Sequence, residues 1–165
     1  LNGRYAEFAG SVIPHDVDIV LVVDEGFELE AKNRLARIGF DRVVGFLQHP
    51  YVVMLDHPDR VRHASRMTAV EFGARRDEID GLQLVDIRNP GELALGVIGG
   101  ATTIPVGQLP SRLAELDPAA PTVVYCAGGY RSSVAASVLR EAGFSDVSDI
   151  LGGYGAWQEI QPSLV

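Results

Sequence analysis

The chain has 165 residues, with 14 lysines and arginines against 22 aspartates and glutamates and a formal net charge of −8. A hydrophobic fraction of 47% and a charged fraction of 22% are typical of a globular protein and exclude wholesale disorder. The acidic balance argues against a nucleic-acid partner, and a single cysteine excludes both an internal disulfide and a thiolate metal cluster.

The hydrophobic pattern excludes two further classes of protein. No apolar stretch approaches the roughly 20 residues that cross a bilayer, and no basic segment followed by an apolar one opens the chain as in a secretory signal. We therefore expect a cytoplasmic protein without a membrane partner. The chain begins with Leu1 rather than Met, which indicates a processed form or a fragment.

The first predicted elements are a strand, a helix and a second strand. Asp18 to Val23 is a short apolar run rich in β-branched residues and predicts a buried strand. Apolar residues then recur at helical spacing from Ala31 to Ile38, and Gly39 is placed to end that helix. Val43 to Phe46 predicts the second strand.

The segment from His49 to Arg66 is rich in His, Pro, Asp and Arg and reads as a linker, within which Val52 to Leu55 is expected to form an edge strand. Thr68 and Glu71 fit a capping box at a helix start. Leu82 to Asp86 then predicts a strand, and Gln108 to Leu116 a short helix.

The strand–helix–strand order returns near the end of the chain. Thr122 to Cys126 and Asp146 to Leu151 predict strands, and the helix between them, Ser132 to Ala142, is followed by Gly143. A shift of 104 residues brings Gly39 onto Gly143. Across the strand–helix–strand segment it also makes six other identical pairs: Val20 with Val124, Ala31 with Ala135, Leu35 with Leu139, Phe40 with Phe144, Val43 with Val147, and Leu47 with Leu151. The shared order indicates an internal repeat.

Alternating strands and helices predict an α/β fold, a mainly parallel sheet with helices on both faces. Residues 64–165 are long enough for one complete small domain. Residues 1–60 hold only part of such a unit, since little chain precedes their first strand.

The segment with the clearest chemistry is the loop from Cys126 to Ser132. A cysteine ends a buried strand, Gly128 and Gly129 permit a tight turn, and a helix begins immediately after. Amides in such a turn can point inward around an anion, and the helix N-terminus adds partial positive charge. With Arg131 nearby, these groups favour a thiolate nucleophile at Cys126.

At this point the sequence resembles the rhodanese family of sulfurtransferases over residues 66–159. Four segments carry the resemblance: Leu84 to Arg88 with Glu92, Gly96 to Pro105, the Cys126 loop, and Leu151 to Gly153 with Ala156 and Trp157. The family usually has His and Pro where this chain has Val97 and Gly99, which are scaffold positions.

The resemblance implies that Cys126 takes a sulfane sulfur and carries it as a persulfide, with no cofactor. Thiosulfate, glutathione persulfide or a protein persulfide would be the donor, and a thiol, sulfite or cyanide the acceptor. The implied substrate-binding residues are Ala127, Gly128, Gly129, Tyr130, Arg131 and Ser132. Arg131 would bind anionic donor groups; Ser132 would bond the sulfur or only cap the helix. Asp86 and Arg88 are expected to be a structural ion pair.

Two other functions remain open. Cysteine phosphatases and arsenate reductases also use a cysteine, a loop and an arginine, but with five intervening residues, whereas four separate Cys126 from Arg131 and Tyr125 precedes the cysteine. The second alternative is a binding module that keeps the fold and uses no catalysis.

The first repeat resembles a rhodanese half without its catalytic residues. By the shift of 104, Val22 stands for Cys126, Asp24 and Glu25 for the two glycines, and Phe27 for Arg131. Two carboxylates would repel an anionic donor, so this copy is expected to be inactive. Residues 2–10 resemble the middle of such a degenerate unit.

A degenerate unit before an active one resembles the C-terminal part of fusion proteins in which a metallo-β-lactamase-fold domain comes first. That domain would be a partner in sulfur transfer. The four histidines lack ligand spacing, so no metal site is expected in this chain; they are His15, His49, His57 and His63.

Overall fold

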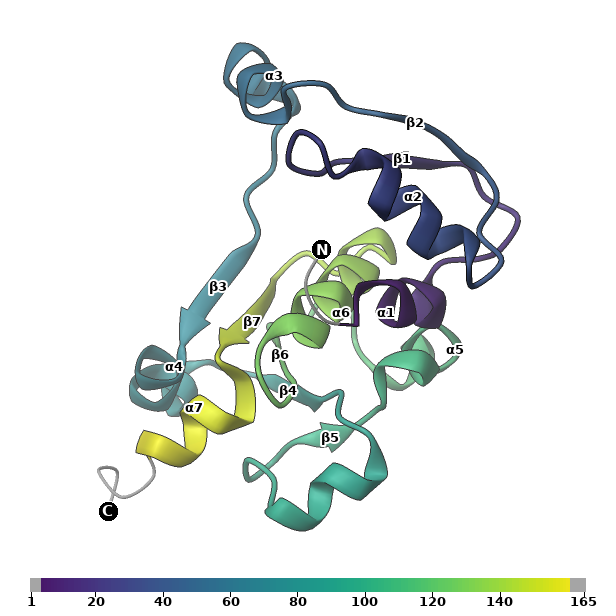
Figure 1. Ribbon diagram of the computed structural model, residues 1–165. Helices are drawn as coiled ribbons and strands as arrows, with labels where there is room; N and C mark the ends of the chain where they lie inside the picture. Colours follow the sequence, from purple (N-terminus) through teal and green to yellow (C-terminus); the bar gives the residue numbers. More distant parts are fainter. Residues whose placement is uncertain (1–3, 161–165) are drawn as a thin grey trace. The chain divides into compact units, whose positions relative to one another are not determined.

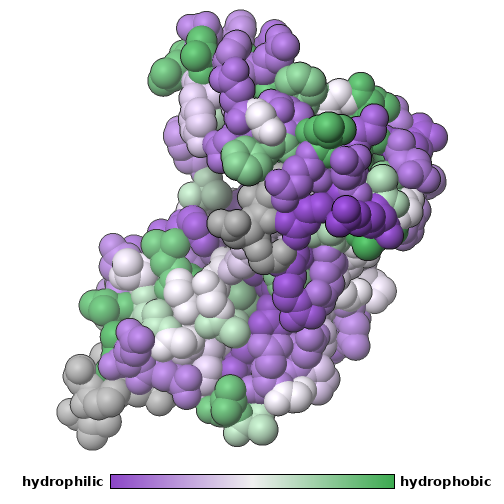
Figure 2. All heavy atoms as spheres, viewed as in Figure 1, coloured by the Kyte–Doolittle hydropathy of each residue, from purple (hydrophilic) through white to green (hydrophobic). Residues whose placement is uncertain are grey.

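The computed structural model describes residues 4–160 (Figure 1). The chain divides into two compact units, the first ending at His63 and the second beginning at Ala64. In the described part of the chain, no helix combines the length and the apolar character that a membrane crossing requires. On the face that Figure 2 shows, hydrophobic residues reach the surface in separate areas among hydrophilic ones.

The second unit is built on a five-stranded sheet whose neighbouring strands all run parallel. Its spatial order is β3 (Ser65–Thr68), β7 (Val147–Leu151), β6 (Thr122–Tyr125), β4 (Gln83–Asp86) and β5 (Thr102–Thr103). All four residues of β6 are buried, as expected for a central strand covered on both faces. The predicted α/β fold with a parallel sheet is confirmed.

Helices cover both faces of this sheet. Figure 1 shows α4 (Ala69–Arg75) beside α7 (Gly153–Ile160) on one side, and α6 (Tyr130–Glu141) with α5 (Leu109–Arg112) on the other. Short 3₁₀ turns complete the connections: η2 (Arg76–Glu78), η3 (Pro90–Leu95), η4 (Val106–Gln108) and η5 (Leu113–Glu115). The helix expected over 108–116 is therefore a single α-helical turn between 3₁₀ turns.

The capping box predicted for this unit is confirmed. At the start of α4, the Thr68 hydroxyl accepts a hydrogen bond from the Glu71 amide, and the Glu71 carboxylate accepts one from the Thr68 amide. Trp157 is a core residue, with its ring centroid 5.6 Å from that of Phe72. The contact between Phe72 and Trp157 packs α4 against α7 on the same face of the sheet.

The first unit consists of α1 (Tyr5–Val12), β1 (Ile19–Leu21), α2 (Glu28–Ala36), β2 (Val43–Phe46), α3 (Pro50–Asp56) and η1 (Pro58–Arg60). β1 and β2 pair in parallel, with α2 as the crossover between them. The small core of this unit comprises Ala9, Leu21, Ala31, Leu35 and Phe40.

Two predictions for the first unit were wrong. The run 18–23 is not a fully buried strand, because Val20 is 61% exposed and Val22 55% exposed. The expected edge strand at Val52 to Leu55 is instead part of α3. Pro50 begins that helix, and its fixed φ angle suits the first helical position.

The two strand–helix–strand segments share backbone geometry at the end of the helix and at one strand pair. Gly39 and Gly143 both have positive φ, +87° and +92°, and each N–H bonds a carbonyl three residues back at 3.0 Å. Phe40 and Phe144 each bond a carbonyl five residues back at 3.1 Å. Under the same shift of 104, the β1–β2 pair Val20 with Gly45 matches the β6–β7 pair Val124 with Asp149.

Candidate active site

Cys126 lies directly after β6, where the central strand of the sheet ends. Its side chain is only 1% exposed, whereas the next two residues, Ala127 and Gly128, are exposed. Gly129 turns the chain with a φ of +90° and precedes α6. The predicted strand–loop–helix arrangement therefore holds the cysteine under a surface loop.

Two groups of the loop and helix reach the sulfur. The amide of Gly129 donates a hydrogen bond to the Cys126 Sγ at 3.1 Å. Ser132, in the first turn of α6, has its Oγ 3.7 Å from the same sulfur and accepts the thiol hydrogen. The contact between Ser132 and Cys126 that the sequence left open is present.

Arg131 is held by Glu92 of η3. Its two terminal nitrogens donate hydrogen bonds of 2.6 Å to the two Glu92 oxygens. These bonds are the main reason that the pKa of Glu92 falls from 4.5 to about 2. The pKa of Arg131 is raised, first by Glu92, with smaller contributions from the Cys126 sulfur. Arg131 thus brings a fixed positive charge to the sulfur.

Asp86, the last residue of β4, and Arg88 form the expected ion pair, and both are buried. Arg88 Nε lies 2.9 Å from Asp86 Oδ1, and Arg88 Nη2 donates to the carbonyl of Gly96 at 2.7 Å. The guanidinium also lies 4.0 Å from the centroid of the Tyr154 ring. This pair supports the loop around Gly96 from beneath.

Hydrogen bonds hold the segment around Val97 and Gly99, where the chain departs from the family pattern. The Ile98 amide donates to the hydroxyl of Tyr125 at 3.0 Å, and burial raises the pKa of Tyr125 above its usual range. The Gly99 carbonyl accepts a hydrogen bond from Arg76 at 2.8 Å. The backbone that follows Val97 is therefore held by one buried and one exposed hydrogen bond.

Gly153 brings the start of α7 against the backbone of the Cys126 loop. The amides of Tyr154 and Gly155 donate to the carbonyls of Cys126 and Ala127 at 2.6 and 3.0 Å. Gly153 has a φ of +56°, and a Cβ there would lie 2.2 Å from the Cys126 carbonyl oxygen. Only glycine permits this approach.

Two residues near the sulfur were not identified from the sequence. Asp149 of β7 is buried and accepts a hydrogen bond of 3.2 Å from the Ser132 hydroxyl. Arg66 of β3 donates to both Asp149 oxygens, at 2.8 and 2.7 Å. An aspartate in the middle of a buried strand was the available signal, since such a charge needs a partner.

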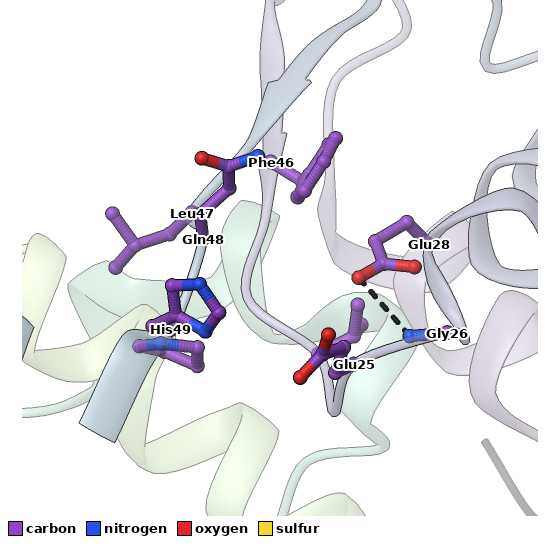
Figure 3. Close-up of a pocket in the computed structure, with 9 residues that line it drawn as sticks. Glu25, Gly26, Glu28, Phe46, Leu47, Gln48 and His49 are labelled. Carbon is purple, nitrogen blue, oxygen red and sulfur yellow. Dashed lines mark hydrogen bonds between the residues drawn. The ribbon is translucent and has the colours of Figure 1, made fainter. Parts of the chain in front are cut away.

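In the first unit, the loop that corresponds to the Cys126 loop under the shift of 104 carries acidic side chains. A pocket of about 320 Å³ lies where β1 and β2 end and α2 begins, and Figure 3 shows Glu25 and Glu28 on its wall. Glu28 accepts a hydrogen bond of 3.2 Å from the Gly26 amide and stands at the position equivalent to Ser132. A carboxylate therefore occupies the position that the Ser132 hydroxyl has in the second unit.

In the described part of the chain, no group of three or more His, Cys, Asp or Glu side chains is placed to hold a metal ion. The chemistry available at Cys126 is that of a nucleophilic sulfur with an amide donor, a hydroxyl and a nearby guanidinium.

Comparisons with known proteins agree on the second unit. The rhodanese-like domain family matches residues 68–160. The thiosulfate sulfurtransferase GlpE of Pseudomonas paraeruginosa is 39% identical over 90 residues, which cover 54% of this chain and 82% of that protein.

Solved structures give the same result. A rhodanese-like domain protein from Staphylococcus aureus has a TM-score of 0.53 and 31% identity, covering 56% of this chain and 90% of its own. A Rhodopseudomonas palustris protein of unknown function, described as a possible tyrosine phosphatase, has a TM-score of 0.53 and 28% identity. It covers 68% of this chain and 92% of its own.

Proposed function

Because the chain belongs to the family of rhodanese-like domains and is a rhodanese-type sulfurtransferase, we propose that Cys126 carries the transferred sulfur as a persulfide. The observation that carries this proposal is the position of the Cys126 sulfur, 3.1 Å from an inward-facing loop amide at the end of the central strand. We infer that residues 64–165 form the domain that is active in sulfur transfer.

The reaction proceeds in two displacements. The Cys126 thiolate attacks the outer sulfur of a donor such as thiosulfate; a new S–S bond forms, the donor's S–S bond breaks, and sulfite leaves with the bonding electron pair. A nucleophilic acceptor then attacks the terminal sulfur of the persulfide and releases the Cys126 thiolate. No net oxidant is needed, since the sulfane sulfur is only passed on.

The loop residues 127–132 bind the donor. The Gly129 amide stabilises negative charge on the Cys126 sulfur. Arg131 attracts the anionic part of thiosulfate or glutathione persulfide, while Glu92 fixes its orientation. Arg131→Ala should therefore slow reaction with anionic donors more than reaction with a neutral alkylating agent. Sulfite, cyanide and thiols are the acceptor class.

A cysteine phosphatase and a non-catalytic binding module would differ from a sulfurtransferase in measurable activity. One structural relative is described as a possible tyrosine phosphatase, but only four residues separate Cys126 from Arg131, which suits one sulfur atom better than a tetrahedral phosphate. A binding module would retain the fold and need no reactive thiol. Thiocyanate production from thiosulfate and cyanide by the wild-type chain, and its loss in Cys126→Ser, distinguishes all three. Hydrolysis of a phosphate ester without thiocyanate would contradict the proposal.

We further propose that residues 1–60 are a partial, inactive rhodanese-like unit. The matched hydrogen bonds at the two helix ends, and the one equivalent strand pair of Val20 with Gly45, support this relationship. The order of an inactive unit before an active one supports the idea that a metallo-β-lactamase-fold domain exchanges sulfur with Cys126. Mixing persulfide-loaded protein with such a domain and following the loss of sulfur from Cys126 tests this partner.

A further inference from the structure

A chain of four side chains connects the surface of the second unit to the Cys126 sulfur. Arg66 and Asp149 are directly paired across β3 and β7, and Val124 of β6 pairs with Asp149 on its other side. The Arg66 side chain is 40% exposed, whereas that of Asp149 is 1% exposed. From Asp149 the contacts continue through Ser132 to Cys126.

The hydrogen of the Ser132 hydroxyl has two competing acceptors. A serine hydroxyl has one hydrogen to donate, and a carboxylate can only accept. The 3.2 Å bond from Ser132 to Asp149 therefore uses that hydrogen, and a lone pair of the Ser132 oxygen faces the sulfur. This arrangement suits a thiol, whose S–H can donate to Ser132, and it gives a thiolate no donor from Ser132.

Arg66 provides hydrogen-bond donors to the Asp149 carboxylate that do not depend on Ser132. Its Nε bonds Asp149 Oδ1 at 2.8 Å and its Nη2 bonds Oδ2 at 2.7 Å, so both oxygens keep a charged donor without Ser132. Arg66 Nη2 also lies 3.3 Å from the carbonyl of Gly129, the residue whose amide bonds the sulfur. The pKa of Arg66 is raised, mainly by Asp149, with a smaller contribution from Cys126.

We propose that Asp149 and Arg66 are positioning residues that act through Ser132 to set the balance between thiol and thiolate at Cys126. In the thiol state Asp149 holds the Ser132 hydrogen. When Cys126 loses its proton to water, that hydrogen turns to the sulfur, and Arg66 keeps the Asp149 carboxylate bonded meanwhile. The inference rests on the proposed role of Cys126 as the sulfur carrier.

The other charged groups around the sulfur stay constant in the test. They are Arg131 of α6 with its partner Glu92 of η3, and the buried pair of Asp86 and Arg88 that follows β4. The equivalent chain is absent from the first unit, where Gly45 stands for Asp149 and Glu28 for Ser132.

The test is the pH dependence of iodoacetamide alkylation, which reports Cys126 alone because the chain has one cysteine. Asp149→Asn puts an amide donor against Ser132 and frees its hydrogen for the sulfur. The midpoint should fall by about one pH unit, the size of one hydrogen bond to a charged group. In Arg66→Ala, the Ser132 hydroxyl is the donor left to the Asp149 carboxylate, so its hydrogen stays on Asp149 and the midpoint should rise. Arg66→Lys restores a charged donor and should reverse part of this rise.

Ser132→Ala separates action through the hydroxyl from a direct electrostatic effect. In a Ser132→Ala background, only the direct charge effect remains, so Asp149→Asn should move the midpoint by less than half as much. A shift of equal size in that background, or no shift with Ser132 present, would overturn the inference. Ser148→Ala is the matched control, since it removes a neighbouring β3–β7 contact of 2.6 Å to Ser65 and should leave the midpoint unchanged.

Sulfur loading by thiosulfate is followed in the same samples. A wild-type chain that takes up no sulfur contradicts the proposed function. A wild-type chain that is loaded, together with unmoved midpoints in the variants, contradicts only the role of Asp149 and Arg66.

Discussion

The guanidinium of Arg131 and the carboxylate of Glu92 are joined by two hydrogen bonds of 2.6 Å, although the two residues are 39 positions apart in the chain. Glu92 also accepts the amide of Asn89 at 3.0 Å in a capping box at the start of η3. One carboxylate thus connects the loop after β4 to the first turn of α6, and it holds the arginine beside the sulfur.

Glu92→Gln should lower the free energy of unfolding at pH 7 by about 2 kcal/mol, since it weakens two charged hydrogen bonds to a mostly buried arginine. The pKa of Glu92 is depressed from 4.5 to about 2. Its contribution to stability is therefore complete above about pH 4.5 and is lost as the pH falls toward 2. Urea unfolding of both proteins from pH 7 to pH 3.5 measures this, and a difference independent of pH would contradict it.

Arg88→Ala should destabilise the second unit by about 3–5 kcal/mol, because it leaves the carboxylate of Asp86 buried without its partner. Arg112→Ala is the control, since Arg112 pairs with Glu115 at the surface and the expected change is much smaller. Denaturant unfolding at neutral pH compares the two variants. Equal losses would show that burial of the Asp86 pair does not matter.

Gly153→Ala should cost at least about 2 kcal/mol of stability, since the added Cβ would lie 2.2 Å from the Cys126 carbonyl and the residue has positive φ. At Gly128 a Cβ would meet no atom within 4 Å and φ is not positive, so Gly128→Ala should be nearly neutral in stability. Thermal melting followed by circular dichroism provides the comparison. A stable Gly153→Ala protein would mean that the start of α7 can move away from the loop.

Val22→Cys should not create a second sulfur carrier. Asp24 and Glu25 follow position 22, and Glu28 stands where Ser132 stands in the active loop, so a thiolate and an anionic donor would both be opposed. The intact mass of Val22→Cys after treatment with thiosulfate should increase by one sulfur atom, and that of Val22→Cys with Cys126→Ser by none. A second sulfur on the single variant would show that the acidic loop is permissive.

Much of the fold follows from local pattern. The central strand β6 carries a continuous apolar run from Val123 onward, and both helix-ending glycines have the positive φ that their position after a helix predicts. The strand 18–23 was expected to be buried because it is a short apolar run rich in β-branched residues. Composition could not reveal that Val20 points to an exposed face of a two-stranded sheet, or that this strand ends before Val22, which is exposed as well.

The site was predictable where its parts are adjacent in sequence. Cys126, Gly129 and Ser132 are brought together by one turn and the start of one helix, so their spacing was informative. Arg66 and Asp149 lie 83 residues apart and meet only through the β3–β7 register, which no local pattern encodes. The same holds for the contact between Gly153 and the Cys126 carbonyl.

The most direct measurement for the central claim is the intact mass of the protein after incubation with thiosulfate, before and after dithiothreitol. We expect a gain of one sulfur atom, which peptide mapping assigns to Cys126. Dithiothreitol should remove this sulfur, and the Cys126→Ser protein should not gain it. An unchanged mass in a folded wild-type protein, or a gain that persists in Cys126→Ser, would contradict the claim.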